Sequence, residues 1–119
     1  MEEQGVKLIF GIQNLKVHAK VCVIERKRNN KIEKFGFIST GNFNESTAKT
    51  YTDLTLFTSN KKILNDVSKV FNFFDLNYKK FNYKYLKLSP FHTQSFFTKM
   101  IKQEIRNAKK NLPASVKIK

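Results

Sequence analysis

The alternating pattern of Leu15–Glu25 constrains the fold of this chain more than any other feature of its sequence. Every second residue from Leu15 to Val23 is apolar, and the positions between them begin with three polar residues. A period of two is typical of a β-strand, because successive side chains point to opposite faces of a sheet. A second alternating run, Lys34–Thr40, follows a polar stretch with Asn29 and Asn30 at its tip. The two runs predict a β-hairpin with a longish loop.

Three other segments predict strands, and one predicts a loop. Val6–Ile12 is a short apolar run that is typical of a buried strand. Tyr51–Thr58 is rich in β-branched and aromatic residues, and Ser115–Lys119 begins to alternate. Gly41–Thr50 is rich in Asn, Ser, Thr and Gly, which predicts a loop.

Two segments with helical spacing lie in the second half of the chain. The first begins after a cap at Ser59 or Asn60 and continues to about Phe74, and the second is Thr93–Lys110. Asp75–Lys87 breaks the pattern between them and predicts a connection. Strands followed by helices in one short chain indicate the α/β or α+β class, with helices flanking a sheet.

The length and the single cysteine limit the class of protein. A chain of 119 residues can bury one modest core but not two independent ones. Its sequence has no apolar run of about 18 residues, as a membrane span would need, and its acidic start does not predict a signal peptide. Cys22 is alone, which predicts no intramolecular disulfide. We therefore expect a cytoplasmic protein without a transmembrane segment.

The net charge of +14 is distributed unevenly along the chain. Residues 1–58 carry a net charge of +3 and residues 59–119 carry +11. A field of this size attracts polyanions such as nucleic acid or polyphosphate. The alternative is that lysine simply fills solvated surface, so the charge alone does not define a function.

His18 and Lys20 are the first residues in the sequence whose side chains suggest a catalytic role. Two positions on one strand share a face, so both side chains are expected to point the same way. A neutral imidazole can attack phosphorus, and a nearby ammonium can neutralise phosphoryl oxygens. By itself, a His-x-Lys sequence on a strand is more often an ordinary surface feature.

Thr40, Gly41 and Asn42 follow the second strand of the hairpin. A glycine lets the backbone approach an anion, and the Thr40 hydroxyl and Asn42 amide can donate to phosphate oxygens. Asp53 lies within the next predicted strand, where a carboxylate needs a partner. The imidazole of His18 is a suitable partner, whereas an outward-facing carboxylate is the alternative.

These motifs, in this order, resemble one half-site of the phospholipase D superfamily. The acid that the superfamily has after the lysine is Glu25 here, and the superfamily's Gly-Ser opening is Ser39-Thr40. The longer stretches also resemble the catalytic region of histidine-phosphorylating polyphosphate kinases. These stretches are GVKLIFGIQNLKVHAKVCVIERK, FGFISTGNFNESTAKTYTDLTLFTSN, DVSKVFNFF and LSPFHTQSFFTKMIKQEIRNAKKNLPASVKIK.

The resemblance implies a fold and a domain organisation. The fold would be an incomplete phospholipase D-like mixed sheet flanked by helices. Residues 1–87 would form the C-terminal part of a first phospholipase D-like domain, and residues 88–119 would open the second. The chain would then be an internal fragment whose partner is the rest of a longer enzyme, and it is expected to be inactive alone.

The resemblance also implies reversible transfer of the terminal phosphate of ATP to polyphosphate. His18 matches the histidine that becomes phosphorylated, Tyr51 a nucleotide-binding residue, and Asp53 the acid that holds the histidine. The chemistry of Lys20, Thr40 and Asn42 suggests that they contact phosphate oxygens. Mg²⁺ is the expected cofactor, with ligands outside this chain, and ATP, ADP and polyphosphate are the expected partners. No specific nucleic acid is expected, and homo-oligomerisation is left open.

Two alternative functions fit parts of the sequence. A phospholipase D-like phosphodiesterase or nuclease could complete its site by dimerising, using the same His18. A basic nucleic-acid-binding module would use the positively charged second half of the chain. Against it, the aromatic residues there mostly lie on the apolar faces of predicted helices and not on an open sheet where bases could stack.

Overall fold

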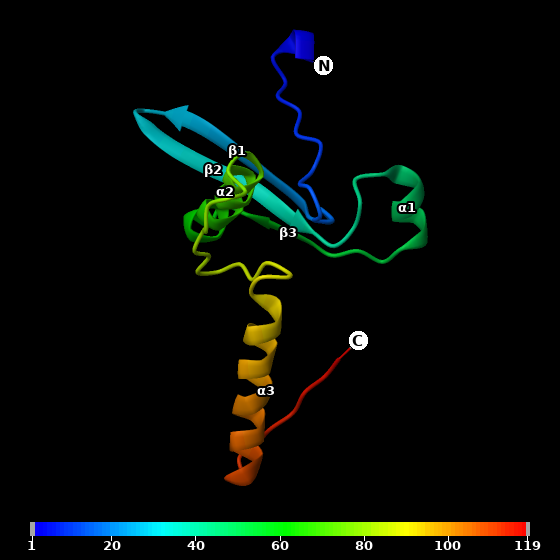
Figure 1. The fold of residues 1–119 in the computed structure, drawn as a ribbon, viewed down its shortest axis with the longest axis vertical. Helices are drawn as coiled ribbons and strands as arrows, with labels where there is room; N and C mark the ends of the chain where they lie inside the picture. The colour runs from blue at the N-terminus through cyan, green and yellow to red at the C-terminus, as the bar shows by residue number, and fades with distance from the viewer. Residues whose placement is uncertain (1, 119) are drawn as a thin grey trace. The chain divides into compact units, whose positions relative to one another are not determined.

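The computed structural model describes residues 2–118, which divide into two compact units (Figure 1). The first unit extends through Tyr85, and the second begins at Leu86. Both helices and strands are present, which confirms the mixed α+β class. None of the helices in residues 2–118 is long and apolar enough to cross a membrane.

The first unit contains an antiparallel sheet of three strands in the order β1-β2-β3. The strands are β1 (Lys20–Arg28), β2 (Lys31–Ser39) and β3 (Thr55–Thr58). The predicted hairpin is confirmed, but the prediction of a longish loop is wrong. Only Asn29 and Asn30 connect β1 to β2, at φ of 48° and 57°. Two left-handed residues match the natural twist of a hairpin, and asparagine adopts this conformation more readily than most residues.

Strand β1 begins five residues later than the alternating pattern predicts. Lys20 pairs with Ser39, which is the last residue of β2. Residues 15–19 therefore have no partner in β2, and they precede the sheet. The end of β2 at Ser39 also limits β3, which begins opposite it at Thr55 and not at the predicted Tyr51.

The predicted strand at Val6–Ile12 is absent from the described structure. Gly11 has a φ of 88°, which lies outside the β region and interrupts an extended run. The side chain of Phe10 is 93% exposed, so this run is not part of the core. A short 3-10 helix, η1 (Glu2–Gln4), precedes it. Residues 115–118 are also not in a strand, and Lys119 lies outside the described residues.

The polar segment Gly41–Thr50 contains a short helix, so the prediction of a loop is wrong for its second half. This helix is α1 (Glu45–Thr50). The Asn44 side chain accepts a hydrogen bond from the Thr47 backbone N–H at 3.1 Å, and Lys49 pairs with Glu45 at 3.0 Å. The same polar residues that favour loops can therefore cap and support a helix.

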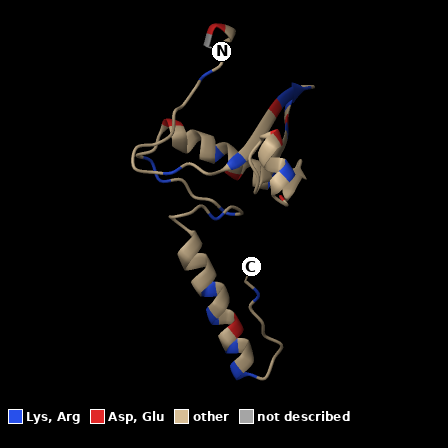
Figure 2. Cartoon of the chain, turned by 90° about the vertical axis from the view of Figure 1, so that its right-hand side faces the viewer, with Lys and Arg blue, Asp and Glu red and all other residues tan. Residues whose placement is uncertain are grey.

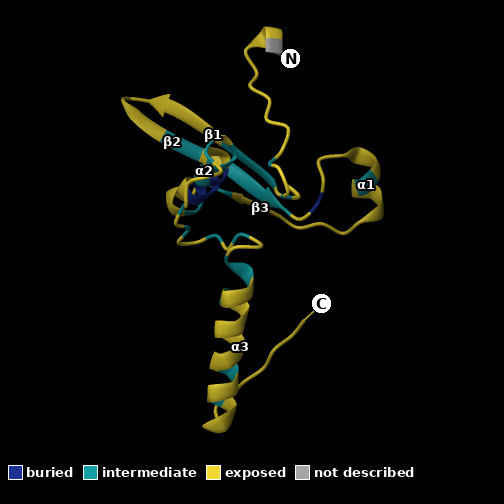
Figure 3. Cartoon of the chain, in the orientation of Figure 1, coloured by how far each residue is buried: buried dark blue, intermediate teal, exposed yellow. Residues whose placement is uncertain are grey.

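The helix α2 (Lys61–Asp75) packs against β1 and β2 and confirms the predicted helix. Its Asn60 cap accepts a hydrogen bond from the Lys62 backbone N–H at 3.0 Å. Figure 3 shows that the buried residues of this unit concentrate on α2. They include Leu64, Val67 and Val70. Burying such side chains contributes about 1.5–3 kcal/mol each, so this stripe holds the helix on the sheet.

Glycine at position 36 lets α2 approach the sheet closely. A Cβ atom there would lie 2.8 Å from Leu64 Cδ2 and would also collide with the Cys22 backbone. Any larger residue at position 36 would therefore displace β1 or push α2 away from the sheet.

A buried carboxylate fastens the connection after α2. Asp66 is only 2% exposed and accepts hydrogen bonds from the Tyr85 backbone N–H at 2.7 Å and from Lys69 Nζ at 2.8 Å. Lys69 also donates to the Asn82 carbonyl at 2.8 Å. Burial, reinforced by the charge of Asp66, raises the pKa of Tyr83. The segment that follows α2 has no helix or strand around Asn82 and Tyr85, and these polar contacts hold it against α2.

The second unit is built on α3 (Thr93–Lys109), which confirms the other predicted helix. Every described residue of α3 retains some exposure, and the apolar side chains of Phe97, Met100 and Ile105 are about half exposed. Glu104 accepts a hydrogen bond from the Ser115 backbone N–H at 3.2 Å, which ties the segment after the helix to α3.

Candidate functional site

The structure brings His18 and Lys20 into contact at the start of β1. Lys20 Nζ lies 2.9 Å from both ring nitrogens of His18 and 3.0 Å from its backbone oxygen. An ammonium has no acceptor, so it donates to whichever ring nitrogen lacks a proton. The contact forms although His18 precedes β1 by two residues.

Thr40 and Asp53 form a second pair of polar side chains. The Thr40 hydroxyl donates to Asp53 Oδ1 at 3.1 Å and accepts a hydrogen bond from the Leu54 backbone N–H at 3.0 Å. The Thr40 backbone N–H donates to the Leu54 carbonyl at 3.0 Å. These bonds continue the pairing of β2 and β3 past the end of both strands, and they position the Asp53 carboxylate.

Gly41 packs directly against the Asp53 carboxylate. Gly41 is buried, and a Cβ atom on it would collide with the carboxylate group of Asp53. Its backbone N–H donates to Ser39 Oγ at 3.2 Å, and Ser39 Oγ also lies 2.9 Å from the Thr55 hydroxyl. The anion that the Gly41 backbone approaches in this structure is therefore the protein's own carboxylate.

The strand register places the two pairs at the same end of the sheet. Ser39, next to Thr40, is opposite Lys20 on one side and opposite Thr55 on the other. Within residues 2–118, however, no hydrogen bond connects Asp53 to His18. The expected histidine–aspartate pair is therefore not joined in this geometry, and each residue has a different polar partner.

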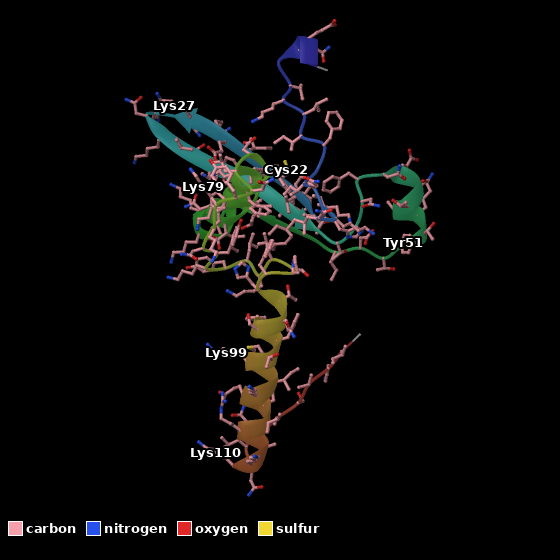
Figure 4. The ribbon with its side chains drawn as sticks, in the orientation of Figure 1. Cys22, Lys27, Tyr51, Lys79, Lys99 and Lys110 are labelled. Atoms are coloured by element: carbon pink, nitrogen blue, oxygen red, sulfur yellow. The ribbon has the colours of Figure 1, made fainter. Side chains whose placement is uncertain are left out.

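Asn42 and Tyr51 are exposed and lie outside these two pairs. Tyr51 ends α1, where its backbone N–H donates to the Thr47 carbonyl at 3.1 Å, and its side chain is 68% exposed. Figure 4 shows Tyr51 beside α1. Both side chains are open to solvent, and neither hydrogen-bonds to His18 or Asp53 within the described part of the chain.

Ser39 is a residue of this cluster to which sequence reasoning assigned no role. Its hydroxyl connects Gly41 to Thr55, and its pairing with Lys20 sets the register. A serine directly before Thr-Gly is the only sequence signal that could have identified it. Its contacts depend on a strand that lies 16 residues further along the chain.

Glu25 makes no hydrogen bond to His18 among the described residues, and its side chain instead joins β1 to β2 and α2. Lys34 Nζ lies 2.6 Å from Glu25 Oε1, and Ser68 Oγ donates to the same oxygen at 3.3 Å. The hydrogen bond from Lys34 lowers the pKa of the Glu25 carboxyl below its ordinary value, and burial opposes this effect only in part. The contacts of Glu25 link the hairpin to α2.

The described residues do not provide a cluster that fits a metal ion. Within residues 2–118, no three His, Cys, Asp or Glu side chains gather closely enough to hold one. A Mg²⁺ site normally uses carboxylates together with substrate phosphates. The side chains of residues 2–118 therefore do not form a protein-based metal site with three such ligands.

Together these contacts define an α+β protein with a histidine–lysine pair and a threonine–aspartate pair at one end of an antiparallel sheet. Residues 1–80 match the family described as polyphosphate kinase C-terminal domain 1. The chain belongs to the polyphosphate kinase family.

The relatives of this chain are much longer than it is. It is 40% identical over 119 residues to the polyphosphate kinase of Escherichia coli (strain K12) and covers 17% of that protein. The polyphosphate kinase of Salmonella typhimurium (strain LT2) is also 40% identical over 119 residues, again with 17% covered. The polyphosphate kinase of Vibrio cholerae serotype O1 is 33% identical over the same length and coverage. All of this chain is aligned, but it spans only 17% of the length of these relatives.

Proposed function

We propose that this chain supplies part of the phosphotransfer site of a polyphosphate kinase, with His18 as the residue that accepts phosphate. The observation that carries the proposal is the contact between the His18 ring and Lys20 Nζ at 2.9 Å. It places a nucleophile beside a cation that can attract and neutralise a phosphoryl group. The phospholipase D-like nature of the sheet is part of the same proposal.

The proposed reaction has two steps at His18. In the first, the Lys20 ammonium moves from the unprotonated ring nitrogen of His18 to the phosphate oxygens. The freed lone pair of that nitrogen forms a bond to the γ-phosphorus of ATP, and the bond to the bridging oxygen breaks. ADP leaves with the electron pair of that bond, in an in-line displacement. In the second, a terminal oxygen of polyphosphate attacks the phosphorus and the P–N bond breaks. The polyphosphate chain gains one phosphate, and the histidine is regenerated.

Lys20 and Thr40 have distinct proposed roles. Lys20 is the cation that contacts the equatorial oxygens of the transferred phosphate, since its ammonium already lies beside the ring. The Thr40 hydroxyl is at present engaged by Asp53 and by the Leu54 backbone, so its proposed donation to phosphate requires it to exchange a partner.

Asp53, Asn42 and Tyr51 take the remaining proposed roles. Asp53 is proposed to orient His18, and its bond to Thr40 at 3.1 Å supports a positioning role at this end of the sheet. Asn42 is proposed to bind phosphate and Tyr51 to bind the nucleotide. Their exposure leaves both accessible to a ligand.

ATP is the proposed phosphate donor and Mg²⁺ the proposed cofactor. Mg²⁺ would neutralise the charge of the nucleotide and polyphosphate when bound. No cluster of three ligands among the described residues fits it, and its ligands are proposed to lie outside this chain. The cytoplasm is the proposed compartment.

The reactivity of His18 is tested with phosphoramidate, a small donor that phosphorylates histidine without a nucleotide site. We expect acid-labile phosphate on His18, and we expect His18→Ala to remove most of it. The matched control is His92→Ala, which removes the other histidine of the chain and should leave the label in place. Label that resists His18→Ala, or that is lost with His92→Ala, would contradict the proposal.

The activity of the chain by itself is tested with ATP and Mg²⁺. Because the chain spans 17% of the length of its relatives, we propose that it does not complete the site alone. No net polyphosphate synthesis is therefore expected, and sustained synthesis by the 119-residue chain would contradict this part of the proposal.

A further inference from the structure

The basic residues of α3 form a strip along one side of the helix. Ser95, Lys99, Lys102, Arg106 and Lys109 follow the spacing i, i+4, i+7, i+11 and i+14. This spacing places their side chains on one face of an α-helix. Figure 2 shows the basic positions distributed along α3, and Figure 4 labels Lys99 on this helix. We call these five residues the cationic strip.

The cationic strip borders an open groove of about 430 Å³. Each lining residue carries a hydrogen-bond donor, and three of them are cations. The lining residues are Gln94, Ser95, Thr98, Lys99, Lys102 and Arg106. Such a surface offers charge and neutral donors together, as an extended phosphate ligand requires.

The charge of the cationic strip is not neutralised by a salt bridge within residues 2–118. Among residues 2–118, the salt bridges use other lysines and arginines, and none involves Lys99, Lys102 or Arg106. Arg106 donates to the neutral amide of Gln103 at 2.6 Å. Glu104, the single acid of α3, is off the strip and accepts a hydrogen bond from the Ser115 backbone. The strip thus presents free positive charge.

Stabilisation of the helix explains only part of this arrangement. Cations near a helix C-terminus interact favourably with the helix dipole, but the effect falls off within the last turn. Arg106 and Lys109 lie in that turn, whereas Lys99 and Lys102 do not. The central pair of cations therefore needs another explanation.

We infer that the cationic strip binds a linear polyphosphate chain, an inference that deepens and rests on the proposed function. Lys99 and Lys109 are ten residues apart, which is about 15 Å along a helix axis. That length suits several consecutive phosphates better than a single one. The strip holds no aromatic residue, so it lacks the stacking platform with which proteins bind the bases of single-stranded nucleic acid.

The test compares two variants of the full chain that lose the same charge. One is K99Q/K102Q/R106Q, and the control K27Q/K31Q/K62Q removes three exposed cations that lie on β1, β2 and α2. Binding of sodium polyphosphate is measured by calorimetry at several salt concentrations. The strip variant should lose about tenfold to a hundredfold in affinity, and its salt slope should fall by about 2, whereas the control should change by less than about threefold.

Several outcomes would overturn the inference. Equal losses in both variants would show that only net charge matters, and an unchanged strip variant would show that the ligand binds elsewhere. Single-stranded RNA that binds the wild type as tightly, with the same loss in the strip variant, would make the strip a general polyanion surface. Circular dichroism of both variants should match the wild type, since glutamine is nearly as good a helix former as lysine.

The phosphoramidate assay separates this inference from the proposed function. His18 lies in the first unit and the cationic strip in the second, so phosphorylation and strip binding are measured on different residues. If His18 is not phosphorylated while the strip variant still loses binding, the phosphotransfer proposal fails and the binding inference stands. If His18 is phosphorylated while the strip variant binds normally, the reverse holds.

Discussion

Replacing Gly41 by alanine should displace the Asp53 carboxylate and destabilise the end of the sheet that carries the candidate site. Gly41 is buried, and a Cβ atom there would lie 2.8 Å from Asp53 Cβ and still closer to the carboxylate. The φ of Gly41 is outside the left-handed region, so alanine is not excluded by the backbone. The collision with Asp53 is therefore the expected source of any destabilisation.

The size of the effect follows from two destabilising terms and one stabilising term. Overpacking a filled site costs about 1–3 kcal/mol. Movement of Asp53 also breaks its hydrogen bond to Thr40, a bond of 3.1 Å, which adds about 1 kcal/mol at most because the pair is exposed. A Gly-to-Ala change at a compatible site stabilises by about 0.4–1 kcal/mol through the unfolded state. Overpacking dominates, and we expect a net loss of about 1–2 kcal/mol.

The assay is urea denaturation of the wild type, Gly41→Ala, Asp53→Gly and the double variant. Asp53→Gly removes the three atoms that lie nearest to the new methyl group. In that background Gly41→Ala should therefore be neutral or slightly stabilising, with a coupling free energy of about 1–3 kcal/mol between the two sites. Additive effects would refute the reasoning, because they would show that Gly41 does not act through Asp53.

Three further substitutions test the contacts of α2. Glu25→Gln should reduce stability at neutral pH, and the difference from the wild type should shrink as pH falls through the folded-state pKa of Glu25. That pKa is lowered by Lys34, so the contribution of Glu25 is fully present above its unfolded pKa. A pH-independent difference in thermal melts would exclude the Lys34 pair as the cause. Leu64→Ala should cost about 2–5 kcal/mol in urea denaturation, since Leu64 is fully buried, and a loss below about 1 kcal/mol would show that α2 does not hold the core. Asp66→Asn should lower the free energy of unfolding by about 1–3 kcal/mol and raise the hydrogen-exchange rate of the Tyr85 N–H. An unchanged exchange rate would show that Asp66 does not hold the segment after α2 through this hydrogen bond.

The sequence predicted the features that depend on local pattern. The helices around Leu64 and Met100 follow an apolar spacing that only an α-helix satisfies, and both form. The hairpin was predicted from two alternating runs, and its turn at Asn29 and Asn30 is where the polar tip was expected. The membership in the polyphosphate kinase family, inferred from motif strings, is confirmed by the match of residues 1–80.

The candidate site shows where sequence patterns stop being sufficient. The motif placed His18 and Lys20 close together, and they are in contact. The expected partner of Asp53 was His18, but the structure pairs Asp53 with Thr40. Both partners were plausible from chemistry alone, because a carboxylate accepts from an imidazole N–H as readily as from a hydroxyl. The choice depends on how the chain after β2 meets the chain before β3.

By itself, the sequence therefore determined the family, the two longer helices and the hairpin, because each rests on residues that are close together in the chain. Only the tertiary structure decided where the strands begin, since Ser39 limits both β1 and β3 through its two partners. It also decided that the apolar run near Phe10 is exposed and that Gly41 closes against Asp53. A β-strand and a polar cluster are completed by residues distant in sequence, so no local pattern contains them.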